Sequence, residues 1–265
     1  MRRVLATLFT VALGGSAGAA DLSRPYMKAP PPPYAPAFSW TGTYVGANLG
    51  AAWGSFNFNP VTTNNLTGVV TAPGAVSASR SSIIGGGQVG YNWQIGQWVL
   101  GLEQDIQFAG LKQTVSFAAP AGFFVTGDSM AVKTDYLSAT RARLGIAWDR
   151  ALFYAAGGLE TGMFDVTSTY AARGAGGSPL IGFTDANKMH FGYTIGGGID
   201  YAVTDNVWLG VEYRYFDVGT ETYNLGAFTP AGGAAQTVST TVGLKASEVT
   251  ARLNVKLNGL GFFGM

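Results

Sequence analysis

In the segment 247–257, the ten residues 248–257 alternate strictly between polar and apolar side chains. Each second residue is polar or charged, and the five apolar positions are Val249, Ala251, Leu253, Val255 and Leu257. This period of two predicts a β-strand with one apolar and one polar face. Its length matches the roughly 9–11 residues that a transmembrane β-strand needs. A half-buried edge strand of a soluble sheet would show the same pattern, so this segment alone leaves both interpretations open.

The same alternation recurs in seven earlier segments, at about residues 44–56, 82–95, 98–108, 134–148, 151–166, 189–203 and 207–215. The connections alternate in length, because tight turns separate four long stretches at about 57–80, 112–132, 168–187 and 218–246. A soluble sandwich has no reason to keep this order, whereas outer-membrane barrels place short turns in the periplasm and long loops outside. We therefore predict an all-β fold: an eight-stranded antiparallel up-and-down transmembrane β-barrel with long extracellular loops and short periplasmic turns.

The composition agrees with a barrel whose outer face meets lipid. Only 12% of the 265 residues are charged, about half of the roughly 25% that is typical of a soluble domain. No internal stretch approaches about 18 consecutive apolar residues, so the low charge does not come from a spanning helix. The formal net charge of +1 argues against nucleic acid as a partner, because nucleic-acid binding needs a basic face.

Both ends of the chain lie outside the predicted barrel, which we assign to residues 40–257. Residues 1–20 predict a secretory signal peptide, with a basic start, an apolar core and the small residues of a cleavage site. Residues 21–39 form a proline-rich periplasmic leader, and this composition favours an extended, flexible tether. A docking segment for a periplasmic partner is the alternative. Residues 258–265 form a C-terminal tail.

The alternation also sorts the charged residues, because those inside the strands lie on the parity that would face the barrel interior. We expect a lumen ion-pair network of Glu103, Asp105, Arg141, Arg143, Glu160, Asp200, Glu212, Arg214, Glu248, Arg252 and Lys256. The two signs nearly balance, as pairing of poorly solvated charges requires. An eight-stranded barrel has room only for its own side chains. We therefore predict a plugged lumen, with a narrow charged channel as the alternative.

Aromatic residues on the opposite parity lie near strand ends, where amphipathic rings form the interfacial girdle of membrane barrels. We expect this girdle to contain Trp53, Tyr91, Trp93, Trp98, Trp148, Phe153, Tyr201 and Tyr215. Ordinary core packing is the alternative, but it does not require the rings to gather at strand ends.

The sequence shows no legible catalytic, cofactor-binding or metal site. The only histidine, His190, has the chemistry of a haem ligand or a general base. It lacks a cysteine or second histidine for a metal site, and no Ser/His/Asp grouping is recognisable. The glycine triplets 85–87 and 196–198 lie inside predicted strands with no helix after them, so the context of a nucleotide loop is missing. We expect no enzymatic activity and no cofactor.

Several segments together resemble one family of surface proteins. They are 21–33, with its run of four prolines, 40–50 (WTGTYVGANLG), 85–94 (GGGQVGYNWQ), 192–198 (GYTIGGG) and 249–254 (VTARLN). They are similar to the small immunogenic and opacity-like proteins of alphaproteobacteria, the rhizobial and Brucella-type porin-family barrels. Such barrels commonly end on an aromatic residue that the assembly machinery reads, whereas the alternation here stops at Leu257. Phe262 and Phe263 are the candidates for that signal, unless the tail results from an extended reading frame.

The resemblance implies a location in the cell outer membrane of a Gram-negative envelope, insertion by the barrel-assembly machinery and antigenic surface loops. We expect contacts with outer-membrane lipid and lipopolysaccharide, and an extracellular ligand on the loops is an open option. The preferred function is that of a surface-exposed barrel contributing to envelope integrity. The alternative is a small porin or a haem-binding uptake protein, since some relatives are reported to bind haemin. A lipid-modifying barrel enzyme is disfavoured by the single histidine.

Overall fold

The computed structural model describes residues 38–72, 74–116, 127–170, 181–229 and 233–257. The predicted signal peptide, the C-terminal tail and nearly all of the proline-rich leader lie outside these residues. Within the described ranges, no helix is long and apolar enough to cross a membrane. The strands are β1 Gly42–Asn64, β2 Val70–Thr71, β3 Val76–Ile95, β4 Trp98–Ser116, β5 Ser129–Trp148, β6 Ala151–Tyr170, β7 Ile181–Ala202, β8 Val207–Phe228 and β9 Gln236–Lys256.

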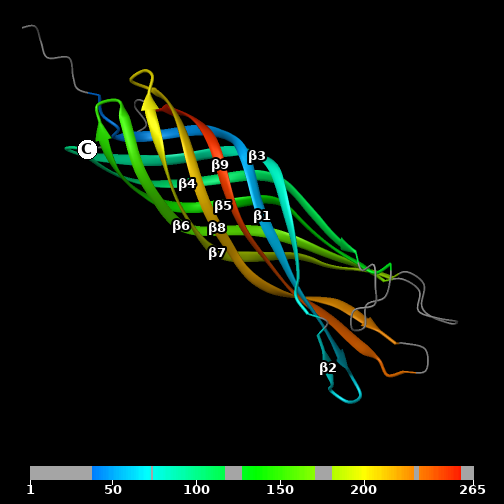
Figure 1. Ribbon diagram of the computed structural model, residues 1–265. Helices are drawn as coiled ribbons and strands as arrows, with labels where there is room; N and C mark the ends of the chain where they lie inside the picture. Colours follow the sequence, from blue (N-terminus) through cyan, green and yellow to red (C-terminus); the bar gives the residue numbers. More distant parts are fainter. Residues whose placement is uncertain (1–37, 73, 117–126, 171–180, 230–232, 258–265) are drawn as a thin grey trace, which may run out of the picture. The chain divides into compact units, whose positions relative to one another are not determined.

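The strands form one antiparallel sheet that closes on itself (Figure 1). Each long strand pairs with its neighbours in sequence, and β1 pairs with β9 from Tyr44↔Lys256 to Asn64↔Gln236. The prediction of eight strands differs from the nine described ones by β2. This two-residue strand pairs with β1 at Thr62 and Thr63, whose other side is already paired with β9, so it lies on the side of β3. The up-and-down order of the long strands follows the alternation in the sequence.

The turns at one end of the sheet are as short as predicted. They lie between β3 and β4, between β5 and β6, and between β7 and β8. Gly96 and Asp149 take positive φ angles of 62° and 52° in the first two turns. Two-residue hairpins need this backbone conformation to match the twist of the strands that they join.

At the other end the predicted loops are too long, because the strands continue well into them. The connection predicted at 57–80 contains the ends of β1 and β3, and the one predicted at 218–246 contains paired residues up to Phe228↔Gln236. The prediction failed here because the outer face of these segments becomes rich in Ser, Thr and Asn. Polar residues hide the alternation on which it relied, while the backbone ladder continues.

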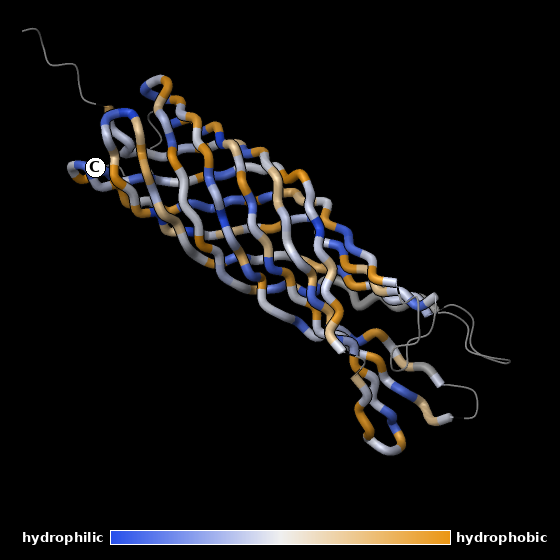
Figure 2. The backbone as a smooth tube through the Cα atoms, in the orientation of Figure 1, coloured by the Kyte–Doolittle hydropathy of each residue, from blue (hydrophilic) through white to orange (hydrophobic). Residues whose placement is uncertain are grey.

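The two faces of the sheet differ in the sense that a membrane barrel requires (Figure 2). On β4, Leu100 and Leu102 are exposed on the outside, whereas Glu103 and Asp105 point inward and are almost completely buried. Figure 2 shows hydrophobic and hydrophilic positions alternating along the strands. A soluble barrel would place its apolar side chains inside, so this inverted pattern fits an outer face in contact with lipid.

Beyond the closed ring, the sheet divides into two arms. The pairing of β3 with β4 stops at Gly85↔Phe108, and that of β7 with β8 stops at Tyr193↔Asp217. The first arm continues β4–β7, and the second continues β8, β9, β1 and β3 together with β2 (Figure 1). Their inner faces share one apolar cluster, the arm core, which includes Phe56, Phe58, Leu111, Val132, Phe164, Phe216, Tyr223 and Leu244.

Close approach of neighbouring strands inside the ring predicts a steric constraint at Gly158. A Cβ atom there would lie 2.0 Å from the carbonyl oxygen of Thr140, whereas one at Gly110 would meet nothing within 4 Å. Gly158→Ala should therefore lower the free energy of unfolding by about 1–3 kcal/mol, as overpacking does. Gly110→Ala, the control, should change it by less than about 1 kcal/mol. Urea unfolding in detergent micelles measures both, and equal effects would contradict the predicted close approach.

Candidate functional site

The inward residues of the ring bring ten ionisable side chains together in the lumen. Each is at most 3% exposed, and the set comprises Glu103, Asp105, Arg141, Arg143, Glu160, Asp200, Glu212, Arg214, Glu248 and Arg252. They come from β4, β5, β6, β7, β8 and β9. Because successive residues of a strand face opposite sides, residues two apart such as Arg141 and Arg143 both point inward.

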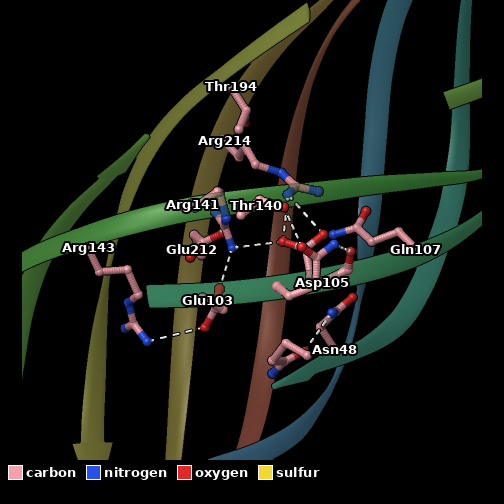
Figure 3. A network of polar contacts seen from close by, with 12 residues as sticks. Asn48, Glu103, Asp105, Gln107, Thr140, Arg141, Arg143, Thr194, Glu212 and Arg214 are labelled. Atoms are coloured by element: carbon pink, nitrogen blue, oxygen red, sulfur yellow. Dashed lines mark hydrogen bonds and ion pairs between the residues drawn. The ribbon is translucent and has the colours of Figure 1, made fainter. Parts of the chain in front are cut away.

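Four of these residues form a closed ring of ion pairs at the centre (Figure 3 shows Arg141 with both carboxylates). Arg141 donates through Nη2 to Glu103 at 2.6 Å and through Nη1 to Glu212 at 2.5 Å. Arg252 contacts the remaining oxygen of each carboxylate. Glu103 and Glu212 thus each lie between the guanidinium groups of Arg141 and Arg252. Hydrogen bonds between charged groups are stronger than those between neutral groups.

Arg143 extends this network toward the turn end of the barrel. Its Nη2 donates to Asp200 at 2.7 Å and its Nη1 to the hydroxyl oxygen of Tyr44 at 2.8 Å. The hydroxyl of Tyr44 in turn donates to Glu103 at 2.7 Å. The guanidinium also lies over the ring of Tyr154, 3.8 Å from its centroid. Both Nη atoms of Arg143 are therefore paired with protein groups, whereas its buried Nε has no hydrogen-bond partner among the described residues.

Arg214 extends the network in the direction of the arms. Its Nε donates to Glu248 at 2.8 Å, and its Nη1 donates to Asp105 at 3.0 Å. Glu160 lies 3.8 Å from the same Nη1, and neither of its carboxylate oxygens has a hydrogen-bond partner among the described residues. This carboxylate is the most weakly paired charge of the network.

The four arginines share a structural device that makes room for them. Each lies directly opposite a glycine on a neighbouring strand, in the pairs Arg141↔Gly158, Arg143↔Gly101, Arg214↔Gly196 and Arg252↔Gly210. A glycine leaves free the volume that a second side chain would fill at the same level. These four glycines are thus explained by the packing of guanidinium groups in a narrow lumen.

Apolar layers close the lumen on both sides of the charged network. At the turn end, Trp40 and Tyr44 pack edge-on against Trp208, with ring centroids 5.4 and 5.2 Å apart. The backbone N–H of Trp40 donates to Gln94 at 2.8 Å, which holds the residues before β1 in the mouth of the barrel. At the opposite end lies the arm core. Buried charged and apolar layers therefore follow one another along the described part of the lumen.

One predicted lumen residue lies elsewhere, and some participants escaped prediction. Lys256 sits at the turn end, where its Nζ donates to the carbonyl oxygen of Ser39 at 2.9 Å and has no part in the central network. Tyr44, Tyr154 and Gln107 were not assigned to the network, yet all three donate to its carboxylates. Their inward parity was the available signal, and a restriction to charged residues overlooked it.

The eight residues predicted for the aromatic girdle all lie on the outer face, and most gather near the turns. Trp98, Trp148 and Tyr201 are exposed there, and on β3 the rings of Tyr91 and Trp93 are 4.5 Å apart. Phe153 also lies near this end of the barrel, close to the turn between β5 and β6. Trp53 and Tyr215 lie farther from these turns, where the outer face changes from apolar to polar residues. The placement follows the two boundaries of the apolar band.

His190 is fully buried and packs against Phe164 and Tyr223 of the arm core. Its Nε2 lies 2.9 Å from the hydroxyl of Tyr223, and its ring is 4.4 Å from that of Phe164. In the part of the chain that the structure describes, no three His, Cys, Asp or Glu residues are grouped to hold a metal ion. A haem could reach this imidazole only after the surrounding aromatic residues had repacked.

Comparison with known proteins assigns this architecture. Residues 7–254 match the family model described as the outer membrane protein beta-barrel domain. The chain belongs to this family. It is 33% identical over 221 residues to the 31 kDa outer-membrane immunogenic protein of Brucella melitensis, covering 83% of this chain and 88% of that protein. It is 30% identical to the 22 kDa outer membrane protein of Rhizobium leguminosarum bv. viciae, over 73% and 71% of the two chains.

Among solved structures, the outer membrane protein OprG of Pseudomonas aeruginosa matches with a TM-score of 0.45 and 10% identity, over 82% of this chain and 97% of that one. The family resemblance expected from the sequence is confirmed, as is the location in the outer membrane. The relatives are outer-membrane barrel proteins, and the all-β antiparallel architecture agrees with theirs.

The central ion-pair ring predicts a large effect of removing one member. Arg252→Met leaves Glu103 and Glu212 each without one buried cationic partner, which should cost about 3–5 kcal/mol in the free energy of unfolding. Lys245→Met is the control, because Lys245 pairs with Asp217 on the exposed outer surface and should leave the unfolding midpoint unchanged. Urea titration in micelles, followed by tryptophan fluorescence, compares the variants. Similar midpoints for both would show that the ring does not hold the barrel together.

Proposed function

We propose that the eight long strands form a sealed transmembrane barrel that serves as a structural and surface-exposed protein of the outer membrane. The lumen network and the aromatic girdle are parts of this proposal. The ring supplies every spanning strand with two neighbours, which a chain surrounded by lipid needs for its backbone groups. Its contribution to envelope integrity would come from a rigid wall with no exposed strand edge at membrane level.

The observation that carries this proposal is the burial of the side chains that point into the lumen. Ten ionisable side chains are at most 3% exposed in the middle, and apolar layers lie on both sides of them. A diffusion pore needs a continuous water path, which would leave its lining residues exposed. An eight-stranded barrel has an interior just wide enough for side chains, so this packing supports a plugged barrel over a small porin.

The orientation of the barrel across the membrane follows from the lengths of the connections at its two ends. Short turns of outer-membrane barrels lie in the periplasm and long connections lie outside, so we assign the arms to the extracellular side. The outer face would then contact outer-membrane lipid and, beside Trp53 and Tyr215, the lipopolysaccharide leaflet. The barrel-assembly machinery would insert the protein, and the arms would present it to extracellular ligands.

The alternative of a haem-binding uptake protein gains no support from the described residues, because His190 is enclosed by Phe164 and Tyr223. An enzymatic role is not supported either, since the buried carboxylates are held by arginines and do not reach the rim. The preferred function therefore rests on the barrel wall and on its exposed arms.

Because the natural chain contains no cysteine, single cysteines can report where water enters. Thr250→Cys places a thiol in the lumen, where Thr250 is 2% exposed, and Ser79→Cys places one on the exposed outer face of the second arm. We expect a charged, water-soluble methanethiosulfonate reagent to modify the arm position at least 100-fold faster than the lumen position in the refolded protein. Single-channel recordings of the chain without residues 1–20 should show no regular openings.

Heat-modifiable gel migration must first confirm that each variant has folded. Rapid modification at position 250, together with reproducible openings in the bilayer, would overturn the sealed barrel and identify a small porin.

A further inference from the structure

The division of the sheet into two arms leaves four strand edges without a ladder partner among the described residues. They belong to β3 at 76–84, β4 at 109–116, β7 at 181–192 and β8 at 218–228. A free edge presents a row of backbone N–H and C=O groups to which a further strand can pair. The four edges differ in how readily they could accept one.

Three of the edges are irregular. The pairing of β4 with β5 is shifted between Phe108 and Leu111, and that of β6 with β7 is shifted after Phe164. The pairing of β8 with β9 is shifted twice, after Asp217 and after Asn224. The edges of β7 and β8 are also bridged, because Lys188 donates to the carbonyl oxygen of Thr222. Bulges and bridging charges are devices that protect natural edges from pairing with other chains.

The edge of β3 has none of these devices except one charge. Its pairing with β1 runs without a shift from Gly42↔Asn92 to Phe58↔Val76, so the upper part is straight and regular. Residues 76–84 contain no proline and a single ionisable side chain, Arg80. Nine regular residues therefore have no ladder partner on this side among the described residues.

Arg80 gives the edge a chemical preference. It is exposed and has no hydrogen bond or ion pair with any residue that the structure describes. Together with Leu111 of β4 and Phe56 of the arm core, it lines a hollow at the gap. A strand added here would meet apolar side chains on its inner face and one unpaired cation.

We propose that residues 76–84 of β3 bind an extended segment of another polypeptide outside the cell, by adding it as a strand to the second arm. The segment would alternate apolar and polar residues and carry an acidic side chain opposite Arg80. A second copy in the same membrane does not fit, because its β3 would run in the same direction, whereas identical edges pair only in antiparallel ladders. The inference rests on the proposed function, which places the arms outside.

The experiment selects peptides from a phage-displayed library of random twelve-residue sequences on the full refolded protein in lipid nanodiscs. Enriched peptides should alternate apolar and polar residues and contain Asp or Glu. Labelled synthetic copies should bind at least tenfold more weakly to Arg80→Glu than to the wild type. Lys133→Glu, the matched control, replaces an exposed lysine that pairs with Asp135 on β5 of the first arm, and it should leave their affinity unchanged. Both variants must show the heat-modifiable migration of the folded barrel.

Disulfide trapping locates the bound peptide. Ser81 of β3 and Ser247 of β9 both lie opposite Trp53 of β1, at one level of the sheet but on different strands. A peptide with a central cysteine should form a disulfide with Ser81→Cys and not with Ser247→Cys. No enrichment over empty nanodiscs, equal trapping at both positions or equal effects of the two charge reversals would overturn the proposal. Binding of lipopolysaccharide micelles, lost in Arg80→Glu and unaccompanied by peptide binding, would overturn it in favour of a lipid.

Labelling of intact cells separates the two levels of inference. If the arms are extracellular, a membrane-impermeant maleimide modifies Ser81→Cys on whole cells. Absence of labelling despite a folded barrel would refute the proposed orientation and with it the strand addition. Labelling without peptide binding would leave the orientation supported and refute the strand addition alone.

Discussion

The pairing of buried charges inside a closed sheet is the constraint on which this structure depends. Lipid outside the ring offers no hydrogen bonds, so the strands must satisfy their backbone groups by closure. Closure directs every second side chain into a narrow interior, where an unpaired charge costs several kcal/mol. The ring made by Arg141, Glu103, Arg252 and Glu212 meets this requirement by placing each charge between two opposite ones. A cross-strand network of this kind also fixes the register of the strands that carry it.

The same constraint explains the distribution of small residues. An arginine that crosses the lumen needs space at its own level, and each of the four has a glycine directly opposite. Gly158 illustrates the tolerance, since an added Cβ would lie 2.0 Å from a neighbouring carbonyl oxygen. The long arginine side chains therefore fit into the lumen because the residues directly opposite them are glycines. Gly196, the first glycine of the triplet 196–198, is one of these four glycines, and this triplet lies inside β7 with no helix after it.

Period-two alternation predicted the long strands and their inner and outer faces, because lipid on one side fixes which parity faces in. Ten of the eleven residues assigned to the lumen lie buried inside the ring. The alternation could not predict which Arg meets which Glu, because the offset between strands is a property of the whole ring. It also missed the arms: Phe58 and Tyr223 lie in stretches taken for loops, where polar outer residues obscure the pattern. Lys256 lies on the inward-facing parity of β9, but it is the last residue of this strand and therefore contacts Ser39 and not the central network.

The buried charge network and the two arms divide the protein into two parts with different physical tasks. The spanning ring is held by charges, and removal of any one of them leaves a buried partner unpaired. The arms are held by apolar packing, which tolerates substitution as long as volume and pattern are kept. Their outer faces and loops can therefore vary while the arm core keeps the strand edges in place. A partner that pairs with such a fixed edge bears mainly its own cost of ordering, and this pre-organisation favours recognition at the arms over recognition by a flexible loop.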